Sequence, residues 1–157
     1  MSTASKNGQI DVVRSLLDRG SDVDERDSHR LTALALASDN GELAVAELLI
    51  GHGADVNSRC TAGRTPLHYA SRSGHLDVVR LLLDHNADFN AFQRNQRTAL
   101  DLASANDGYL DIVRLLLQRG ANANVWNSYG RTPRQEALAY GHGRIAESLL
   151  KYSAFDT

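Results

Sequence analysis

The stretch GHLDVVRLLL at residues 74–83 returns almost unchanged as GYLDIVRLLL at residues 108–117. A looser copy, GELAVAELLI, occupies residues 41–50. The glycines that open these three copies lie 33 and 34 residues apart, and a further step of 33 residues in each direction reaches Gly8 and Gly141. A period in this range is typical of an array of stacked supersecondary units. The chain is therefore predicted to present an extended surface rather than a deep pocket.

The repeat that contains residues 74–83 shows how one unit is built. Thr65 is placed to cap a helix, and Pro66 suits the first helical position, where no amide is needed. Gly74 ends this helix, and a second helix with an apolar face is expected over residues 76–84. Asn86 then stands where other units have glycine, as a left-handed cap. Helices this short are not stable alone, so each must pack against the neighbouring unit.

Three motifs together resemble the ankyrin repeat. They are TPLH at residues 65–68, GHLDVV at residues 74–79 and ADVN at residues 54–57. The resemblance runs from about residue 4 to residue 154, and several of the motifs recur in register. It implies an all-α solenoid of stacked antiparallel helix pairs with projecting hairpin-like fingers. In this family the fingers and the first helices form the concave binding face.

We expect a single ankyrin-repeat domain over residues 1–157. Its repeats are expected at residues 1–26 (incomplete), 27–59, 60–92, 93–126 and 127–157 (a C-terminal cap). The fourth repeat carries one extra residue, which predicts a bulged or lengthened helix end near Asp107. Polar residues 134–136 replace core residues in the last repeat and are expected to form its solvent-facing outer surface. Residues 1–7 are expected to be the least stable part.

The amino-acid composition, the length of the apolar runs and the net charge favour an intracellular protein. The single cysteine, Cys60, leaves no disulfide framework and fits a reducing compartment. No apolar run approaches the roughly 18 residues that span a bilayer, and the N-terminus lacks the apolar core of a signal peptide. The net charge of −2 predicts neither membrane nor nucleic-acid binding. We expect a cytoplasmic location, with the nucleus as the alternative.

Catalytic constellations are not evident in the sequence. No two of the six histidines share a helix at metal-ligand spacing, and Cys60 has no obvious partner base. The repeated glycines lie between two helices rather than after a strand, so they do not form a phosphate loop. We therefore expect no enzyme activity, no metal, no cofactor and no small-molecule substrate.

Positions that vary while the core repeats are the candidates for partner contact. In the fingers they carry arginines and large aromatic residues, the types enriched in binding hot spots. No acid occurs in residues 58–64, 91–97 or 125–131, which predicts a basic face. The candidate contacts, which include the ends of the first helices, are Arg59, Arg64, Arg72, Phe92, Arg94, Arg97, Asn106, Trp126, Tyr129, Arg131 and Tyr140. The alternative is that the aromatics pack on neighbouring fingers and the arginines only add solubility.

The predicted function is a non-catalytic protein-interaction module, natural or engineered, whose protein or peptide partner has an acidic and partly apolar surface. A stoichiometric inhibitor of a partner enzyme is an alternative that the sequence does not separate from it. Nucleic-acid binding through arginines and stacked aromatics is a third reading, which the net negative charge and the presence of only two lysines disfavour. The family resemblance also implies that the turn asparagine Asn57 is a candidate site of hydroxylation.

Overall fold

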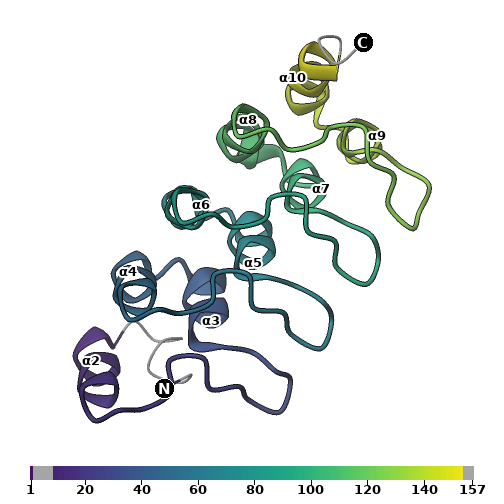
Figure 1. Cartoon of the computed structure of the whole chain (residues 1–157). Coiled ribbons are helices and arrows are strands. Elements are labelled where there is room, and N and C mark those ends of the chain that lie inside the picture. The colour runs from purple at the N-terminus through teal and green to yellow at the C-terminus, as the bar shows by residue number, and fades with distance from the viewer. Residues whose placement is uncertain (2–8, 154–157) are drawn as a thin grey trace. The chain divides into compact units, whose positions relative to one another are not determined.

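The computed structural model describes residue 1 and residues 9–153 of the chain. Within these ranges the chain forms nine α-helices, one short 3-10 helix and no β-strand (Figure 1). The predicted all-α class is confirmed. Residues 2–8, which include most of the segment expected to be least stable, lie outside the described residues. The fold consists of two compact units, residues 1–88 and residues 89–157, and the repeat boundaries given above stay predictions.

The first unit holds its helices in two layers. The first helices of successive repeats, α3 and α5, pack side by side, and the second helices pack in the order α2, α4, α6. Contacts between α3 and α4, and between α5 and α6, join the two layers. The bounds are Ile10–Asp18 for α2, Ala33–Asn40 for α3, Leu43–Gly51 for α4, Pro66–Ser73 for α5 and Leu76–Asp84 for α6.

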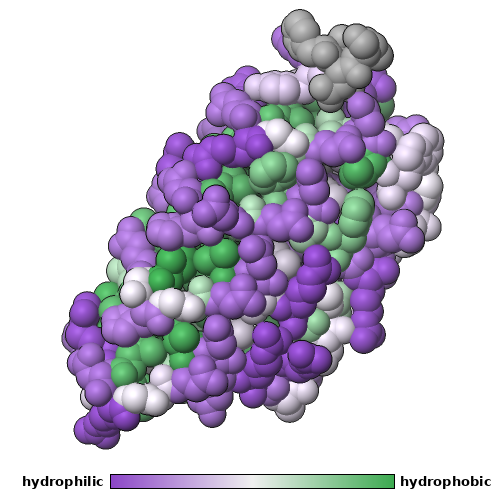
Figure 2. All heavy atoms as spheres, in the orientation of Figure 1, coloured by the Kyte–Doolittle hydropathy of each residue, from purple (hydrophilic) through white to green (hydrophobic). Residues whose placement is uncertain are grey.

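The second unit repeats this arrangement. Helix α7 packs against α9, α8 packs against α10, and the pairs α7 with α8 and α9 with α10 contact each other. The bounds are Ala99–Ser104 for α7, Asp107–Tyr109 for the 3-10 helix η1, Leu110–Gln118 for α8, Pro133–Ala139 for α9 and Gly143–Ser153 for α10. In the space-filling view, apolar side chains gather between neighbouring helices while hydrophilic residues cover the loops (Figure 2).

Threonine caps start the first helices, as the sequence predicts. Thr98 has an extended backbone, and its Oγ1 accepts a hydrogen bond from the Asp101 amide at 3.3 Å. The Asp101 carboxylate in turn accepts from the Thr98 amide at 2.9 Å, which completes a capping box. Thr65 and His68 form the equivalent pair in the first unit, where the Thr65 amide donates to the His68 Nδ1 at 3.2 Å. These bonds satisfy amides that have no partner inside the helix.

A glycine at position 41 is required by both the backbone and the packing. Gly41 ends α3 with φ at 74°. A Cβ at this position would overlap the imidazole ring of His75. That ring reaches back to the preceding repeat, with Nε2 at 3.1 Å from the Asp39 carbonyl oxygen. The repeated glycine therefore makes room for a side chain that ties adjacent repeats together. Asn86 has φ at 62°, which confirms its role as a left-handed cap.

The extra residue of the fourth repeat does not lengthen a helix. Helix α7 has only 6 residues and is the shortest α-helix in the described part of the chain. The chain then continues through Ala105 and Asn106 into the separate 3-10 turn Asp107–Tyr109. The irregularity lies where the sequence predicts it, but the expected bulged or lengthened helix end is wrong. One added residue breaks the α-helical hydrogen-bond pattern, and the tighter 3-10 turn absorbs it.

The last repeat also departs from its prediction. Glu136 was expected on a solvent-facing surface with its neighbours 134 and 135, but it is only 2% exposed. The reason is that two arginines from the preceding fingers lie over it, as described below. Gln135 is exposed and Arg134 is partly exposed, so the expectation of an outer polar surface fails only at Glu136.

Candidate binding surface

Backbone hydrogen bonds give the fingers a defined shape. In the first unit the Cys60 amide donates to the Arg64 carbonyl at 3.1 Å, and in the second the Asn127 amide donates to the Arg131 carbonyl at 2.9 Å. Adjacent fingers within a unit are also joined, for example by the Ser128 amide donating to the Asn95 carbonyl at 3.0 Å. The side chains on the fingers are therefore held at fixed spacing.

In the first unit the predicted arginines are organised around a tyrosine. The guanidinium carbons of Arg64 and Arg72 lie 5.8 and 5.5 Å from the ring centroid of Tyr69, within cation–π range. Arg72 also forms an ion pair with Asp39 at 3.0 Å. Arg59 is exposed on the finger, and its carbonyl accepts from Arg26 at 3.0 Å.

Tyr69 itself was not among the predicted site residues. It is 9% exposed, and its hydroxyl lies 3.4 Å from the Cys60 sulfur. Burial raises the pKa of Tyr69 to about 12. Burial also acts to raise the pKa of the Cys60 thiol. The hydrogen bond with Tyr69, the backbone hydrogen bonds with Arg64 and Ala62, and the charge of Arg64 together outweigh it, so that pKa is lowered. The sequence carries one signal for Tyr69, which is that Leu36 and Leu102 stand at the same repeat position.

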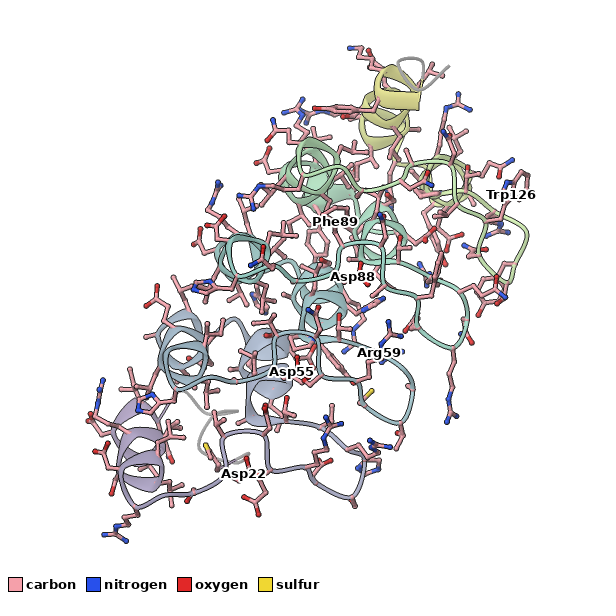
Figure 3. All side chains as sticks on the ribbon, viewed as in Figure 1. Asp22, Asp55, Arg59, Asp88, Phe89 and Trp126 are labelled. Atoms are coloured by element: carbon pink, nitrogen blue, oxygen red, sulfur yellow. The ribbon has the colours of Figure 1, made fainter. Side chains whose placement is uncertain are left out.

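In the second unit large aromatic residues are exposed on the fingers. The exposed fractions are 43% for Phe92, 60% for Trp126 and 62% for Tyr129. Figure 3 shows Trp126 on the outer side of the finger between α8 and α9. The Tyr129 hydroxyl is 3.5 Å from the Asn95 amide nitrogen, and Arg94 is exposed on the neighbouring finger. We call Phe92, Trp126 and Tyr129 the aromatic finger surface.

A buried carboxylate lies beneath two of the predicted arginines. Arg97 pairs with Glu136 at 3.1 Å, and Arg131 pairs with its other carboxylate oxygen at 3.5 Å. Arg97 also donates to the Asp101 carbonyl at 3.3 Å, and its side chain is only 17% exposed. Burial raises the pKa of the nearby Asp101 carboxyl, and Glu136 adds to this effect while Arg97 opposes it. Arg97 therefore has a structural role, and its contact with a partner stays a prediction.

The predicted basic face is thus less basic than the finger sequences suggest. Arg72 meets Asp39, and Arg97 and Arg131 share Glu136. Both acids come from the first helices, α3 and α9, outside the acid-free finger segments. Pairing lowers the net charge of the surface and also occupies some of the guanidinium donors, such as the Arg72 N–H that donates to Asp39.

Two predicted residues at the helix ends have different environments. Asn106 donates from its side-chain amide to the Leu102 carbonyl at 3.3 Å, so it is used to close α7. Tyr140 is 56% exposed and stacks on His142 with ring centroids 6.0 Å apart. Tyr140 therefore adds a further exposed aromatic ring to the second unit.

The Asn57 side chain is held at both ends. Its Oδ1 accepts from the Asp88 amide at 2.8 Å, and its Nδ2 donates to the Asn86 carbonyl at 3.2 Å. Asp55 and Asp88 lie in equivalent turns of successive repeats (Figure 3). The same link joins Asn90 to the Asn122 amide at 3.0 Å in the second unit. Asn57 therefore ties repeats together, and its modification stays a prediction.

The residues that the structure describes contain no group of three or more histidine, cysteine or acidic side chains that could hold a metal ion. In the same part of the chain no helix is long and apolar enough to cross a membrane.

Comparison with known protein families agrees with the repeat geometry. A search of curated proteins found no match. A model of ankyrin repeats (3 copies) matches residues 1–93, 58–126 and 91–157, which together span the chain. Ankyrin repeats generally act as protein-interaction modules without catalytic activity, and the chain belongs to the ankyrin repeat family.

Proposed function

We propose that the chain is a non-catalytic interaction module that binds a protein segment through the aromatic finger surface. The observation that carries this proposal is the exposure of Trp126 and Tyr129, each more than half exposed on one finger. Monomeric proteins seldom expose several large aromatics together without a binding role. Tryptophan and tyrosine anchors also dominate the energetics of known interfaces.

The partner segment is expected to combine apolar side chains with acidic ones. Apolar side chains would cover the rings, and acids would face Arg94, which is exposed on its finger, since neither finger segment, 91–97 or 125–131, contains an acid. Nucleic acid is less well matched, because Arg97 and Arg131 already share the Glu136 carboxylate. An inhibitor role would use the same surface, and an activity assay on the captured partner would distinguish it.

The proposal is tested by selecting binders from a displayed random peptide library. The selected peptides should be enriched in aspartate or glutamate next to aromatic or aliphatic residues. Trp126→Ala should lower the affinity for each selected peptide by roughly tenfold or more, since an aromatic anchor contributes about 2 kcal/mol to binding. Leu138→Ala is the matched control, because Leu138 is 50% exposed in the same unit but lies on α9 rather than on a finger. Peptides that bind both variants equally well would place the binding surface elsewhere.

A further inference from the structure

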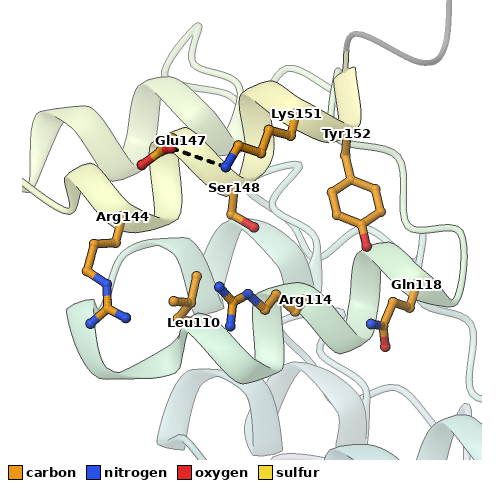
Figure 4. Close-up of a pocket in the computed structure, with 8 residues that line it drawn as sticks. All are labelled: Leu110, Arg114, Gln118, Arg144, Glu147, Ser148, Lys151 and Tyr152. Atoms are coloured by element: carbon orange, nitrogen blue, oxygen red, sulfur yellow. Dashed lines mark ion pairs between the residues drawn. The ribbon is translucent and has the colours of Figure 1, made fainter.

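A basic groove lies between the second helices of the last two repeats. It has a volume of about 330 Å³ and is open to solvent between α8 and α10 (Figure 4). Arg114 contributes to it from α8, and Arg144 and Lys151 contribute from α10. Ser148 and Tyr152 add two hydroxyl groups, and Glu147 adds the single carboxylate. None of these residues belongs to the aromatic finger surface.

The first unit contains a groove at the same repeat positions with different chemistry. The groove between α2 and α4 has a volume of about 380 Å³. It has the same arginine and glutamate, as Arg14 and Glu47. Ile10 and Leu110 are a conservative pair, and Gln118 lines only the α8–α10 groove. The replacements that change the chemistry are on the second helix of each pair: Ala44 by Arg144, Leu48 by Ser148, Gly51 by Lys151 and His52 by Tyr152.

These replacements change the charge of the groove. In the α2–α4 groove the charge of one arginine is balanced by that of one glutamate. Three cations and one glutamate give the α8–α10 groove a net charge of +2. The position of Arg144 is occupied by Asp11, Ala44, Asp77 and Asp111 in the other repeats, and the position of Lys151 by Asp18, Gly51, Asp84 and Gln118. Cations at both positions are therefore peculiar to the last repeat and are not a property of the repeat itself.

The ion pairs around the groove leave its cations accessible. Lys151 pairs with Glu147 at 3.2 Å, but both side chains are about two-thirds exposed or more. Arg114 is 3.7 Å from Asp111, and this pair is also exposed. Arg144 has no hydrogen-bond or ion-pair partner among the described residues. Exposed pairs are weak, so a ligand with more negative charge than one carboxylate can draw these side chains to itself.

We propose that the α8–α10 groove binds a phosphate monoester carried on a sugar or polyol. A phosphate monoester has close to two negative charges at neutral pH, which matches the +2 of the lining better than a carboxylate does. Arginine presents a planar fork of donors to phosphate oxygens, and lysine adds a point charge. The volume is at the lower end of the range for small-ligand sites and exceeds what one phosphate group fills. The remaining space adjoins the phenol ring of Tyr152, against which a sugar or polyol ring can pack.

The test uses isothermal titration calorimetry with inositol monophosphate, a soluble polyol with one phosphate monoester, as the probe. Binding to the wild-type chain is expected, and Arg144→Ala with Lys151→Gln should weaken it by about a hundredfold, because each of the two lost charged hydrogen bonds costs roughly tenfold. Arg14→Ala is the control. It removes an arginine from the α2–α4 groove, at the position that Arg114 has in the α8–α10 groove, and should leave the affinity for the probe unchanged. Absence of binding to the wild-type chain would overturn the proposal, as would equal binding by the double variant. Thermal unfolding followed by circular dichroism checks that each variant is folded.

A transplant supplies the complementary gain of binding. Ala44→Arg, Leu48→Ser, Gly51→Lys and His52→Tyr together would give the α2–α4 groove the cations and hydroxyl groups of the α8–α10 groove, and Asp18→Gln removes the acid at the position of Gln118. Gly51 has open space around it and needs no positive φ, so lysine fits there. In a chain that also carries the double variant, the transplant should restore probe binding, and failure to do so would contradict the assigned residues.

A second arm distinguishes a soluble ligand from a lipid headgroup. Phosphatidylcholine vesicles with a minor fraction of a phosphatidylinositol monophosphate are tested in a sedimentation assay. Binding to both vesicles and the soluble probe, each lost in the double variant, supports the site and identifies a lipid source. Binding to the soluble probe alone supports a free phosphorylated ligand. Vesicle binding without soluble-probe binding would indicate general charge attraction and would overturn the site.

Discussion

Tyr69 in the first unit and Glu136 in the second occupy the same repeat position, and each lies beneath two arginines. In the first unit the arginines stack on a neutral ring, at 5.5 and 5.8 Å from its centroid. In the second they pair with a carboxylate that is 2% exposed. The equivalent residues in the other repeats are leucines, Leu36 and Leu102. The side chain at this one position supports the finger above it, and it is apolar in Leu36 and Leu102, a polarisable ring in Tyr69 and a charged carboxylate in Glu136. Only the charged support neutralises part of the charge of the arginines that lie over it.

The largest expected effect comes from removing the charged support. Glu136→Ala would leave the largely buried guanidinium of Arg97 without its carboxylate. Loss of one partner of a buried ion pair costs about 3–5 kcal/mol, and the low end, about 3 kcal/mol, applies because Arg97 is still partly exposed. Chemical denaturation followed by circular dichroism measures this loss. Glu147→Ala removes an exposed carboxylate of the same unit and should cost less than about 0.5 kcal/mol; equal losses in the two variants would show that Glu136 is not specially placed.

Removing the polarisable support should cost less. Tyr69→Leu installs the residue found at Leu36 and Leu102, and an aliphatic side chain fills most of the space of the ring. The chain should lose about 1–2 kcal/mol, from the cation–π contacts and from imperfect filling of the volume. Denaturant unfolding measures this loss as well. Tyr69→Phe keeps the ring and should cost less than Tyr69→Leu; the opposite order would mean that the hydroxyl contact with Cys60, not the ring, matters most.

The comparison also shows what the sequence could and could not predict. The threonine caps, the glycine at position 41 and the apolar leucines each follow from local rules, so the helix pairs were predictable. Glu136 also stood out as a departure at a core position, but only the packing of the helices shows that it faces inward. The pairing with Arg97 joins two repeats, and no local rule places those side chains within 3.1 Å. The same limit applies to the α8–α10 groove, whose cations come from two helices.

Neighbouring fingers within each unit differ in backbone strain. The tip position has a positive φ in every finger, but it is a glycine in only one finger of each unit: φ is 74° at Gly63 and 60° at Arg30 in the first unit, and 67° at Gly130 and 51° at Gln96 in the second. A residue with a Cβ pays about 1–2 kcal/mol in this region, while glycine costs about 0.5–1 kcal/mol of extra chain entropy. Gln96→Gly should therefore stabilise the chain by about 0.5–1 kcal/mol in thermal or denaturant unfolding. Gly63→Ala is the reverse control and should destabilise it; stabilisation by both changes would contradict the strain argument.

The smallest effect concerns pH and the carboxylates of the second unit. Asp101 is buried near Glu136 of α9, and Arg97 and its own cap residue Thr98 are its other polar neighbours. Burial raises its pKa above the ordinary value of 3.8. The folded chain therefore holds this proton at pH values where the unfolded chain has lost it. Consequently the contribution of Asp101 to stability is present at and below pH 3.8 and is lost as the pH rises through the folded-state pKa.

Asp101→Asn removes this titration while keeping a side-chain oxygen that can accept from the Thr98 amide. Other carboxylates titrate in both proteins, so the difference between the two unfolding free energies isolates Asp101. Relative to the variant, the wild-type chain should gain stability as the pH falls from neutral toward 3.8. The first unit carries His68 at this position and lacks the equivalent carboxylate, so the change should appear in probes of the second unit, such as the fluorescence of Trp126. A difference that is constant with pH, or that grows in favour of the variant on acidification, would mean that Asp101 is not held in a charge-disfavouring site and that Arg97 compensates both carboxylates.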